Sequence, residues 1–335
     1  MRGSTVGVEK GLGASRRVGI AALILLGLGV GALSLYEAVS QVRQSGDDAR
    51  LAPHQWIDLS EPKTEVVTSS PSTARSLPVR VAVAPVISPE RSIGIYRGLV
   101  DYLAARLKRQ PVFLQRSTYA EVNDLVRYGR CDLAFVCTYA FVRGEREFGM
   151  EAIVVPRVNG AVTYRSLILA PSMSRTSSLL DLRGQRFASA DVMSHTGWIS
   201  PALYILERGY DPDHFFSEHV ITGSHDRSVD AVRSGDVDGA AVDSLVYDRM
   251  RETDPDVGRR TKVIHESSSY GIPPVVVNPR LEPSLKKELQ AALLVMHEDT
   301  EGKRVLAEIG IDRFVLPDPA LYDSARRAAE AWEAR

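Results

Sequence analysis

The sequence predicts an α/β protein composed of two similar lobes, and three observations favour this fold class. Residues 119–136 (YAEVNDLVRYGRCDLAFV) recur without a gap 106 positions later as residues 225–242 (HDRSVDAVRSGDVDGAAV). Each copy has the pattern of a helix, a glycine stop, a Gly-x-x-Asp turn and a short buried strand. The chain has 335 residues, enough for two lobes that each bury a core. A generic βαβ unit repeated by chance is the alternative, but composition alone rarely produces gapless register.

The composition excludes several classes of function. The chain has 41 Lys and Arg against 42 Asp and Glu, a formal net charge of -1, so we expect no nucleic-acid partner. Cys131 and Cys137 lie on one predicted strand, too far apart for a disulfide if that strand is extended. Their spacing does not match a metal site. We therefore expect two buried thiols, no metal ligands and no cofactor.

The N-terminal part of the chain has the pattern of a membrane segment followed by a linker. A basic segment at 1–17 precedes residues 18–36, which carry no charge and, at about 1.5 Å per residue, just span a bilayer core. This order predicts a cytoplasmic N-terminus, an inner-membrane anchor and a periplasmic, extracytoplasmic remainder. A cleaved signal peptide is the alternative, with a weak cleavage site near residues 37–40. The Ser-, Pro- and Thr-rich stretch at 37–77 is typical of a flexible linker.

The first lobe is expected at residues 78–170. Its predicted elements are a buried strand from Val79, a helix over 92–108, a strand over 111–115, the first repeat helix opened by a Thr118–Glu121 capping box, a strand over 132–137, a helix from Tyr139 and a strand over 151–156. The order of strands and helices alternates, which is typical of a parallel sheet covered by helices.

The second lobe is expected at residues 171–265, and residues 266–335 are expected to return to the first lobe. The predicted elements here are a strand over 186–190, a helix ending before Gly209, a strand over 219–223 and the second copy of the repeat. The runs 261–267 and 273–279 have the pattern of return strands, and helices close the chain.

A polar turn at the start of the second lobe has the features of an anion site. Ser194, His195, Thr196 and Gly197 lie between a predicted strand and helix, at the carboxyl edge where open α/β sheets bind ligands. Hydroxyls, an imidazole and free backbone N–H groups at a helix N-terminus suit an anion. The alternative is that Ser194 or Thr196 only caps the helix.

Other candidate residues lie at the same edge in both lobes. His225 opens the second repeat helix and can donate to an oxyanion. Asp243 follows the buried strand GAAV and can accept an O–H from a protonated oxyanion, or it merely caps the next helix. The first lobe and the region between the lobes contribute four more candidates: Tyr119, Thr138, Tyr139 and Tyr164. Tyrosines are more often packing residues, and that alternative stays open for each.

Several motifs together resemble those of a known family. They are Tyr119 with its Gly-x-x-Asp turn, Thr163-Tyr164, the Ser-x-Thr-Gly turn at 194–197, Ser-His-Asp at 224–226, Val-Asp-Ser at 242–244 and Gly-Ile-Asp-x-Phe at 310–314. From about Val79 to Tyr322 the chain resembles the phosphate, phosphite and phosphonate substrate-binding proteins of ABC transporters, a branch of the type II periplasmic binding proteins. This resemblance implies a bilobal fold with a ligand cleft between the lobes.

The resemblance also implies roles for the candidate residues. Ser194, His195 and Thr196 would hold the oxyanion with helix-end amides. The ligand would also contact Tyr119, Tyr164 and His225, and Asp243 would close the site. His195 stands where the family more often has a small hydroxyl residue, which leaves the particular oxyanion open.

Three functions follow as hypotheses. The first is a binding protein that delivers a small phosphorus oxyanion to an ABC permease. The second is a membrane-anchored sensor that partners a signalling protein such as a kinase. The third is an enzyme on the same fold, against which the sequence shows no activated nucleophile, metal set or phosphate loop. We therefore expect no catalytic residues.

Overall fold

The structure, a computed structural model, describes residues 77–335. The predicted basic segment at 1–17, the apolar segment at 18–36 and the linker up to residue 76 lie outside the described residues. Within the described range, no helix is both long and apolar enough to cross a bilayer. The membrane anchor therefore stays a prediction.

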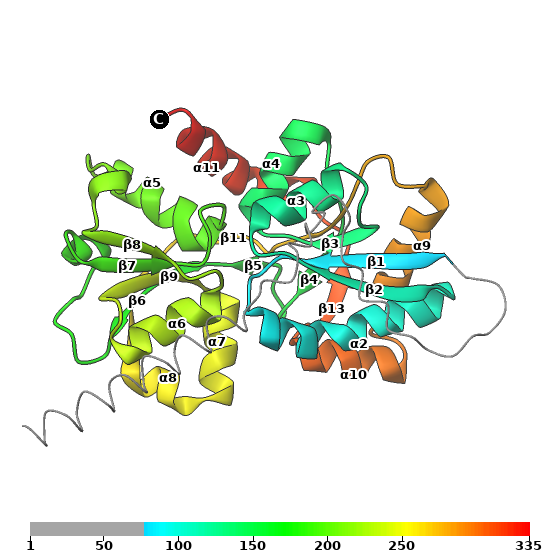
Figure 1. Ribbon diagram of the computed structural model, residues 1–335, viewed down its shortest axis with the longest axis horizontal. Coiled ribbons are helices and arrows are strands. Elements are labelled where there is room, and N and C mark those ends of the chain that lie inside the picture. The colour runs from blue at the N-terminus through cyan, green and yellow to red at the C-terminus, as the bar shows by residue number, and fades with distance from the viewer. Residues whose placement is uncertain (1–76) are drawn as a thin grey trace, which may run out of the picture. The chain divides into compact units, whose positions relative to one another are not determined.

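The first lobe is a six-stranded sheet with helices on both faces (Figure 1). Its strands, in spatial order, are β13 (Arg313–Val315), β4 (Glu151–Arg157), β12 (Val275–Val277), β3 (Leu133–Phe135), β1 (Pro78–Val83) and β2 (Gln110–Gln115). β1 pairs in parallel with β2 and β3, whereas β12 is antiparallel to β3 and β4. Val79 and Val81 of β1 enter the core on one face and Ala82 enters the core on the other, so both faces are buried.

Six helices cover this sheet. On the valine face of β1 lie α2 (Pro89–Leu107), α9 (Pro283–Leu294) and α10 (Thr300–Ile309). On the opposite face lie α3 (Tyr119–Arg127), α4 (Thr138–Phe148) and α11 (Asp323–Glu333). Thr118 accepts from the backbone N–H of Glu121 while the Glu121 side chain accepts from Thr118, which confirms the predicted capping box of α3.

The second lobe is a five-stranded sheet that is also covered on both faces. Its strands, in spatial order, are β10 (Thr261–Glu266), β6 (Ser166–Pro171), β9 (Gly239–Asp243), β7 (Arg186–Ser189) and β8 (Glu218–Ile221). One face carries α6 (His225–Ser234), α7 (Ser244–Thr253) and α8 (Pro255–Arg260). The other face carries the short helix η1 (Leu179–Leu182) and α5 (Ser200–Leu206).

Two strands mark where the chain crosses between the lobes. β5 (Thr163–Tyr164) and β11 (Tyr270–Gly271) form a separate antiparallel pair. The sequence predicts a lobe boundary at residue 170 and a return of residues 261–267 to the first lobe. Both β6 and β10 instead pair within the second sheet, so the chain crosses near residue 165 and returns near residue 270. The apolar pattern of a strand does not reveal which sheet it joins.

The internal repeat extends beyond the segment that the sequence revealed. The elements β1, α2, β2, α3, β3 and α4 have counterparts 106 residues later in β7, η2 (His195–Ile199) with α5, β8, α6, β9 and α7. An Arg–Asp pair recurs with them: Asp132 accepts from the backbone N–H and guanidinium of Arg80. Asp238 accepts in the same way from Arg186, at the same separation of 52 residues. The two lobes are therefore built on one plan.

The C-terminal helix α11 contacts both lobes. Arg326 forms an ion pair with Glu145 of α4 in the first lobe. Trp332 packs edge-to-face against Trp198, with ring centroids 6.1 Å apart, and Arg335 pairs with Asp213 of the second lobe. The helix thus closes one flank of the region between the lobes.

Candidate functional site

The polar turn at residues 194–197, predicted to bind an anion and called the cradle below, lies inside the protein. Ser194, His195 and Thr196 each have 0% exposure. Ser194 is the N-cap of η2, and its Oγ accepts from the backbone N–H of Gly197 at 3.0 Å. The first turn here is a π-helix, a rare geometry that is frequent at functional sites. The capping alternative for Ser194 is therefore correct, and the same turn still presents its other groups to the lobe interface.

His225 is held by two hydrogen bonds inside the protein. Its Nδ1 accepts from the backbone N–H of Asp243 at 3.1 Å, and its Nε2 lies 3.1 Å from the Oγ of Ser194. Because Nδ1 accepts, the neutral ring carries its proton on Nε2 and donates it to Ser194. Burial lowers the pKa of His225 to about 3, which agrees with a neutral ring. Donation from His225 to a ligand stays a prediction, and it would require the bond to Ser194 to break.

This arrangement leaves Ser194 with a proton to donate. Its Oγ already accepts from Gly197 N–H and from the His225 ring. A hydroxyl accepts two hydrogen bonds and donates one, so the remaining capacity of Ser194 is its own O–H. The serine that caps the helix is therefore also an oriented donor.

Three predicted site residues have buried polar atoms without a hydrogen-bond partner among the described residues. They are the phenol oxygen of Tyr119, the Oγ1 of Thr196 and both ring nitrogens of His195. Burial raises the pKa of Tyr119 well above its usual value and lowers the pKa of His195 to about 3, so both side chains are neutral at pH 7. Buried polar atoms almost always have partners, so these atoms are available to a ligand.

Of the two alternative roles that the sequence left for Asp243, the structure shows the helix cap. As the N-cap of α7, its Oδ1 accepts from the backbone N–H groups of Leu245 and Val246, at 2.8 and 3.4 Å. Burial raises the pKa of this carboxyl to about 7, so it is partly protonated at neutral pH. A carboxyl of this kind can share a proton with an oxyanion, while its bonds to α7 use only one oxygen.

The remaining predicted residues are placed less directly. The Tyr164 hydroxyl donates to Thr138 Oγ1, which donates to the carbonyl of Gly271, so this chain joins the crossover strands β5 and β11 to α4. The Tyr139 hydroxyl donates to Glu333 of α11 at 3.0 Å and is engaged away from the Ser194 turn. Ligand contacts from Thr138, Tyr139 and Tyr164 stay predictions.

Two carboxylates that join the lobes at this site, Asp191 and Asp226, are not among the predicted site residues. The carboxylate of Asp191 accepts from the backbone N–H of Tyr119 at 3.1 Å, across the interface. Asp226 accepts from both the backbone N–H and the hydroxyl of Ser88, at 2.9 and 2.7 Å. The signal was present, because Ser88 precedes Ser194 by the repeat distance of 106 and occupies the N-cap position of the corresponding helix α2.

Comparisons with known proteins point to one family. A family model described as "ABC transporter, phosphonate, periplasmic substrate-binding protein" matches residues 81–322. The chain is 27% identical over 194 residues to the phosphate-import protein PhnD of Mycolicibacterium smegmatis, a match that covers 53% of this chain and 60% of that protein. It is 23% identical over 197 residues to the phosphonates-binding periplasmic protein of Escherichia coli, covering 57% of this chain and 58% of the relative. The chain thus spans less than two thirds of these relatives.

Solved structures share the fold. A binding protein component of an ABC phosphonate transporter from Pseudomonas aeruginosa has a TM-score of 0.72 at 22% identity, covering 77% of this chain and 87% of the other. PhnD1 from Prochlorococcus marinus, solved with methylphosphonate, has a TM-score of 0.69 at 17% identity, covering 77% and 98%. These likenesses confirm the predicted bilobal periplasmic-binding-protein fold. Because the family model spans most of the chain, the resemblance stated above is also confirmed: the chain belongs to the periplasmic substrate-binding proteins of phosphonate ABC transporters.

Proposed function

We propose that this protein is an extracytoplasmic binding protein for a small phosphorus oxyanion, a phosphonate, phosphite or phosphate, which it delivers to an ABC permease. One observation carries the proposal. Donors of Tyr119 and Thr196 are buried at the lobe interface without a partner, beside a Ser194 hydroxyl that still has its proton to donate. Oriented donors in a water-free cleft bind an oxyanion strongly.

The first lobe offers an internal example of the same chemistry. At the N-terminus of α2, the backbone N–H and hydroxyl of Ser88 bind the carboxylate of Asp226. Ser194 takes the corresponding position in the second lobe, at the N-terminus of η2. The positive end of a helix dipole favours an anion at both positions. The backbone N–H of Ser194 donates to the carbonyl of Asp191 at 3.0 Å, so only the hydroxyl of Ser194 would bind an oxyanion as the Ser88 hydroxyl binds Asp226.

Asp243 supports an oxyanion that carries a proton. A carboxyl with a pKa near 7 can accept the O–H of a phosphonate or phosphate monoanion, whereas it repels an anion that has no proton to offer. At pH 7 the ligand would meet neutral His195 and His225 rings, so binding would depend on hydrogen bonds more than on net charge. This favours phosphorus oxyanions over sulfate.

The residues around the cradle would orient its donors and support closure of the two lobes. In this proposal His225 orients Ser194, and the Tyr164–Thr138–Gly271 chain supports the crossover strands about which the lobes would move. His195 would contact the ligand through a ring nitrogen, with the ring held edge-on against Tyr270 at 4.1 Å between centroids. The predicted membrane anchor at 18–36 belongs to the same proposal.

Calorimetry on the full chain, purified in mild detergent, tests the proposal. We expect methylphosphonate, phosphite or phosphate to bind more tightly than sulfate or any amino acid. Tight binding of an amino acid, or of sulfate in preference to all three phosphorus oxyanions, would overturn it.

A further inference from the structure

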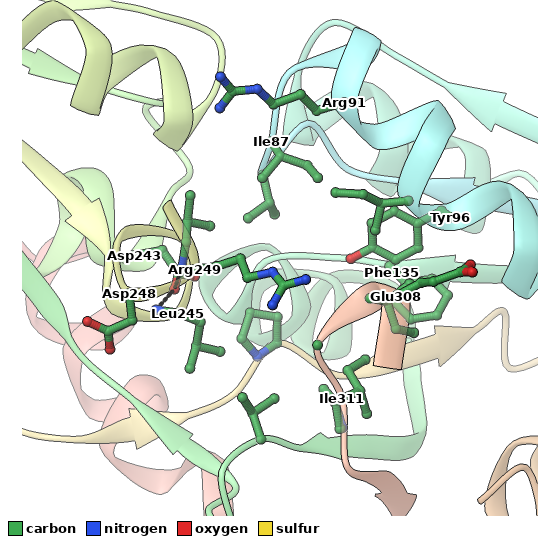
Figure 2. Close-up of a pocket in the computed structure, with 18 of the residues that line it drawn as sticks. Ile87, Arg91, Tyr96, Phe135, Asp243, Leu245, Asp248, Arg249, Glu308 and Ile311 are labelled. Atoms are coloured by element: carbon green, nitrogen blue, oxygen red, sulfur yellow. Dashed lines mark hydrogen bonds between the residues drawn. The ribbon is translucent and has the colours of Figure 1, made fainter. Parts of the chain in front are cut away.

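A large cavity lies between the lobes on the flank that α11 does not cover (Figure 2). Its volume is about 1030 Å³, and its wall comes from α2 and α10 of the first lobe and α7 of the second, with no residue from α11. Pockets for drug-sized ligands typically measure 300–1,000 Å³. The cavity is therefore several times larger than an inorganic oxyanion needs.

The inner wall of this cavity is mainly apolar. It is lined by Ile87, Tyr96, Phe135, Leu245, Val246 and Ile272. Charged groups lie further out, where Arg249 extends from α7 between the lobes and faces Tyr96 and Glu308 (Figure 2). The guanidinium of Arg249 pairs with Glu252 of its own helix at 3.6 Å. These charged side chains are exposed, so the outer part of the cavity is polar, whereas the inner part is apolar.

Three wall residues connect the cavity to the oxyanion cradle. Asp243 lines the cavity, and its backbone N–H donates to His225. Val86 also lines it, and its carbonyl accepts from the backbone N–H of His225 at 2.9 Å. Val136 lies in the wall immediately before Cys137, whose sulfur accepts from the His195 N–H. The cavity and the cradle are therefore neighbouring parts of one interface.

We propose that this cavity receives the organic substituent of the ligand, so that the preferred substrate is a phosphonate or phosphate monoester with an aromatic or branched apolar group. This inference rests on the oxyanion function proposed above. The apolar inner wall begins at Asp243, where the group attached to phosphorus would emerge, and it favours a group without charge. A peptide partner in the same groove is the competing occupant.

The test compares ligands of one head group and different substituents on the full chain. We expect phenylphosphonate and benzylphosphonate to bind about ten- to a hundred-fold more tightly than methylphosphonate, because burial of an aromatic group is favourable by that amount. If the site also accepts phosphate monoesters, phenyl phosphate should bind with an affinity similar to that of phenylphosphonate. Equal or weaker binding of the aromatic ligands would overturn the inference.

A matched pair of variants tests the location. Ile87 is half-buried and its side chain lies in the cavity, whereas Ile93, on the first turns of α2, is 47% exposed and lies outside the wall. Ile87→Trp should remove the advantage of the aromatic ligands and leave methylphosphonate affinity unchanged, while Ile93→Trp should change neither. An Ile87→Trp protein that keeps the full aromatic preference would contradict the location, and Val246→Trp repeats the test from the other lobe.

The outcomes separate the two proposals. If the wild-type chain binds no phosphonate at all, the proposed function fails and this inference fails with it. If methylphosphonate binds and the substituent has no effect, only the inference about the cavity is wrong. That second result, together with a peptide that binds without displacing methylphosphonate, would assign the groove to a partner.

Discussion

Single side chains at the lobe interface differ in whether the protein itself uses their polar atoms. The Oγ1 of Thr196 has no partner among the described residues, whereas the Oγ1 of Thr261, also buried in the second lobe, donates to the carbonyl of Val257 at 2.7 Å. The hydroxyl of Thr196 therefore makes no hydrogen bond that stabilises the described fold, whereas the hydroxyl of Thr261 does. A valine at position 196 should therefore change ligand affinity and not stability, and a valine at position 261 should change stability and not ligand affinity.

We expect Thr196→Val to weaken oxyanion binding by about 1.5–3 kcal/mol, roughly ten- to more than a hundred-fold, because it removes a donor to a charged oxygen. Its melting temperature should stay close to that of the wild type. Thr261→Val should instead lower stability by about 1 kcal/mol and leave the dissociation constant unchanged. Thermal melts and calorimetry on both variants check this, and a Thr196→Val protein that binds normally would remove Thr196 from the site.

Asp243 should control selectivity rather than stability. Asparagine caps helices as well as aspartate does, so Asp243→Asn should keep the cap of α7. It would lose the carboxyl that accepts a ligand proton and rejects fully ionised anions. The ratio of methylphosphonate to sulfate affinity should fall by about tenfold or more. Asp318→Asn, at the exposed N-cap of the short helix η4 (Pro319–Tyr322), should leave this ratio unchanged.

His195 should make stability depend on pH in a definite direction. Its folded-state pKa is depressed to about 3 by burial, whereas the unfolded chain titrates near 6.5. Its contribution to stability is therefore present above pH 6.5 and is lost as the pH falls toward 3. In ligand-free protein, the wild type should lose about 1.5–2 kcal/mol relative to His195→Gln between pH 6.5 and 5.

Chemical denaturation at several pH values measures this difference. His214 supplies a control of opposite sign, because its exposed ring pairs with Asp211 and its pKa is raised. The contribution of His214 should be present at low pH and lost as the pH rises, and it should be small. A flat difference between wild type and His195→Gln would mean that the buried ring can be protonated without cost.

At the scale of elements, the Arg–Asp pair occurs once in each repeat and links its last strand, β3 or β9, to its first strand, β1 or β7. Asp132 is buried and receives the backbone and guanidinium of Arg80, whereas the Asp238 side chain is 36% exposed. Hydrogen bonds to a buried charge contribute more than those in exposed pairs. We expect Asp132→Asn to destabilise the protein by about 1.5–3 kcal/mol and Asp238→Asn by under about 1 kcal/mol in urea unfolding. Equal costs would show that burial does not govern this motif.

The sequence could predict elements that depend on local pattern and could not predict those that depend on pairing. Both repeat copies, the capping box at Thr118 and the Ser194 turn follow from short-range patterns, and the structure has them where expected. The placement of β6 and β10 in the second sheet depends on neighbours far away in the chain. The hydrogen bond from Tyr139 to Glu333 likewise depends on a helix almost 200 residues later, so the sequence could not show that this phenol already has a partner.

At the scale of the whole described chain, one cluster of contacts joins the lobes at the rim of the interface. Asp226 of α6 binds Ser88 and lies 3.3 Å from the guanidinium of Arg91, both in the first lobe. Nearby, Arg227 pairs with Glu90, but the two side chains are 48% and 73% exposed. The buried contacts of Asp226 should hold the lobes together, and the exposed pair should add little.

We therefore expect Asp226→Ala to shift the protein toward an open arrangement of the lobes. The contacts to Ser88 and Arg91 join residues from opposite lobes, so they cannot persist when the lobes separate. Without these contacts, a smaller fraction of the molecules should be closed. The apparent ligand affinity should fall in proportion to that fraction, although the cradle itself is unchanged. Small-angle X-ray scattering should show a larger radius of gyration for ligand-free Asp226→Ala than for the wild type, and ligand should reduce that difference. Arg227→Ala should scatter and bind like the wild type, and if Asp226→Ala does so too, the lobes are held by other contacts, such as the bond from Tyr119 to Asp191.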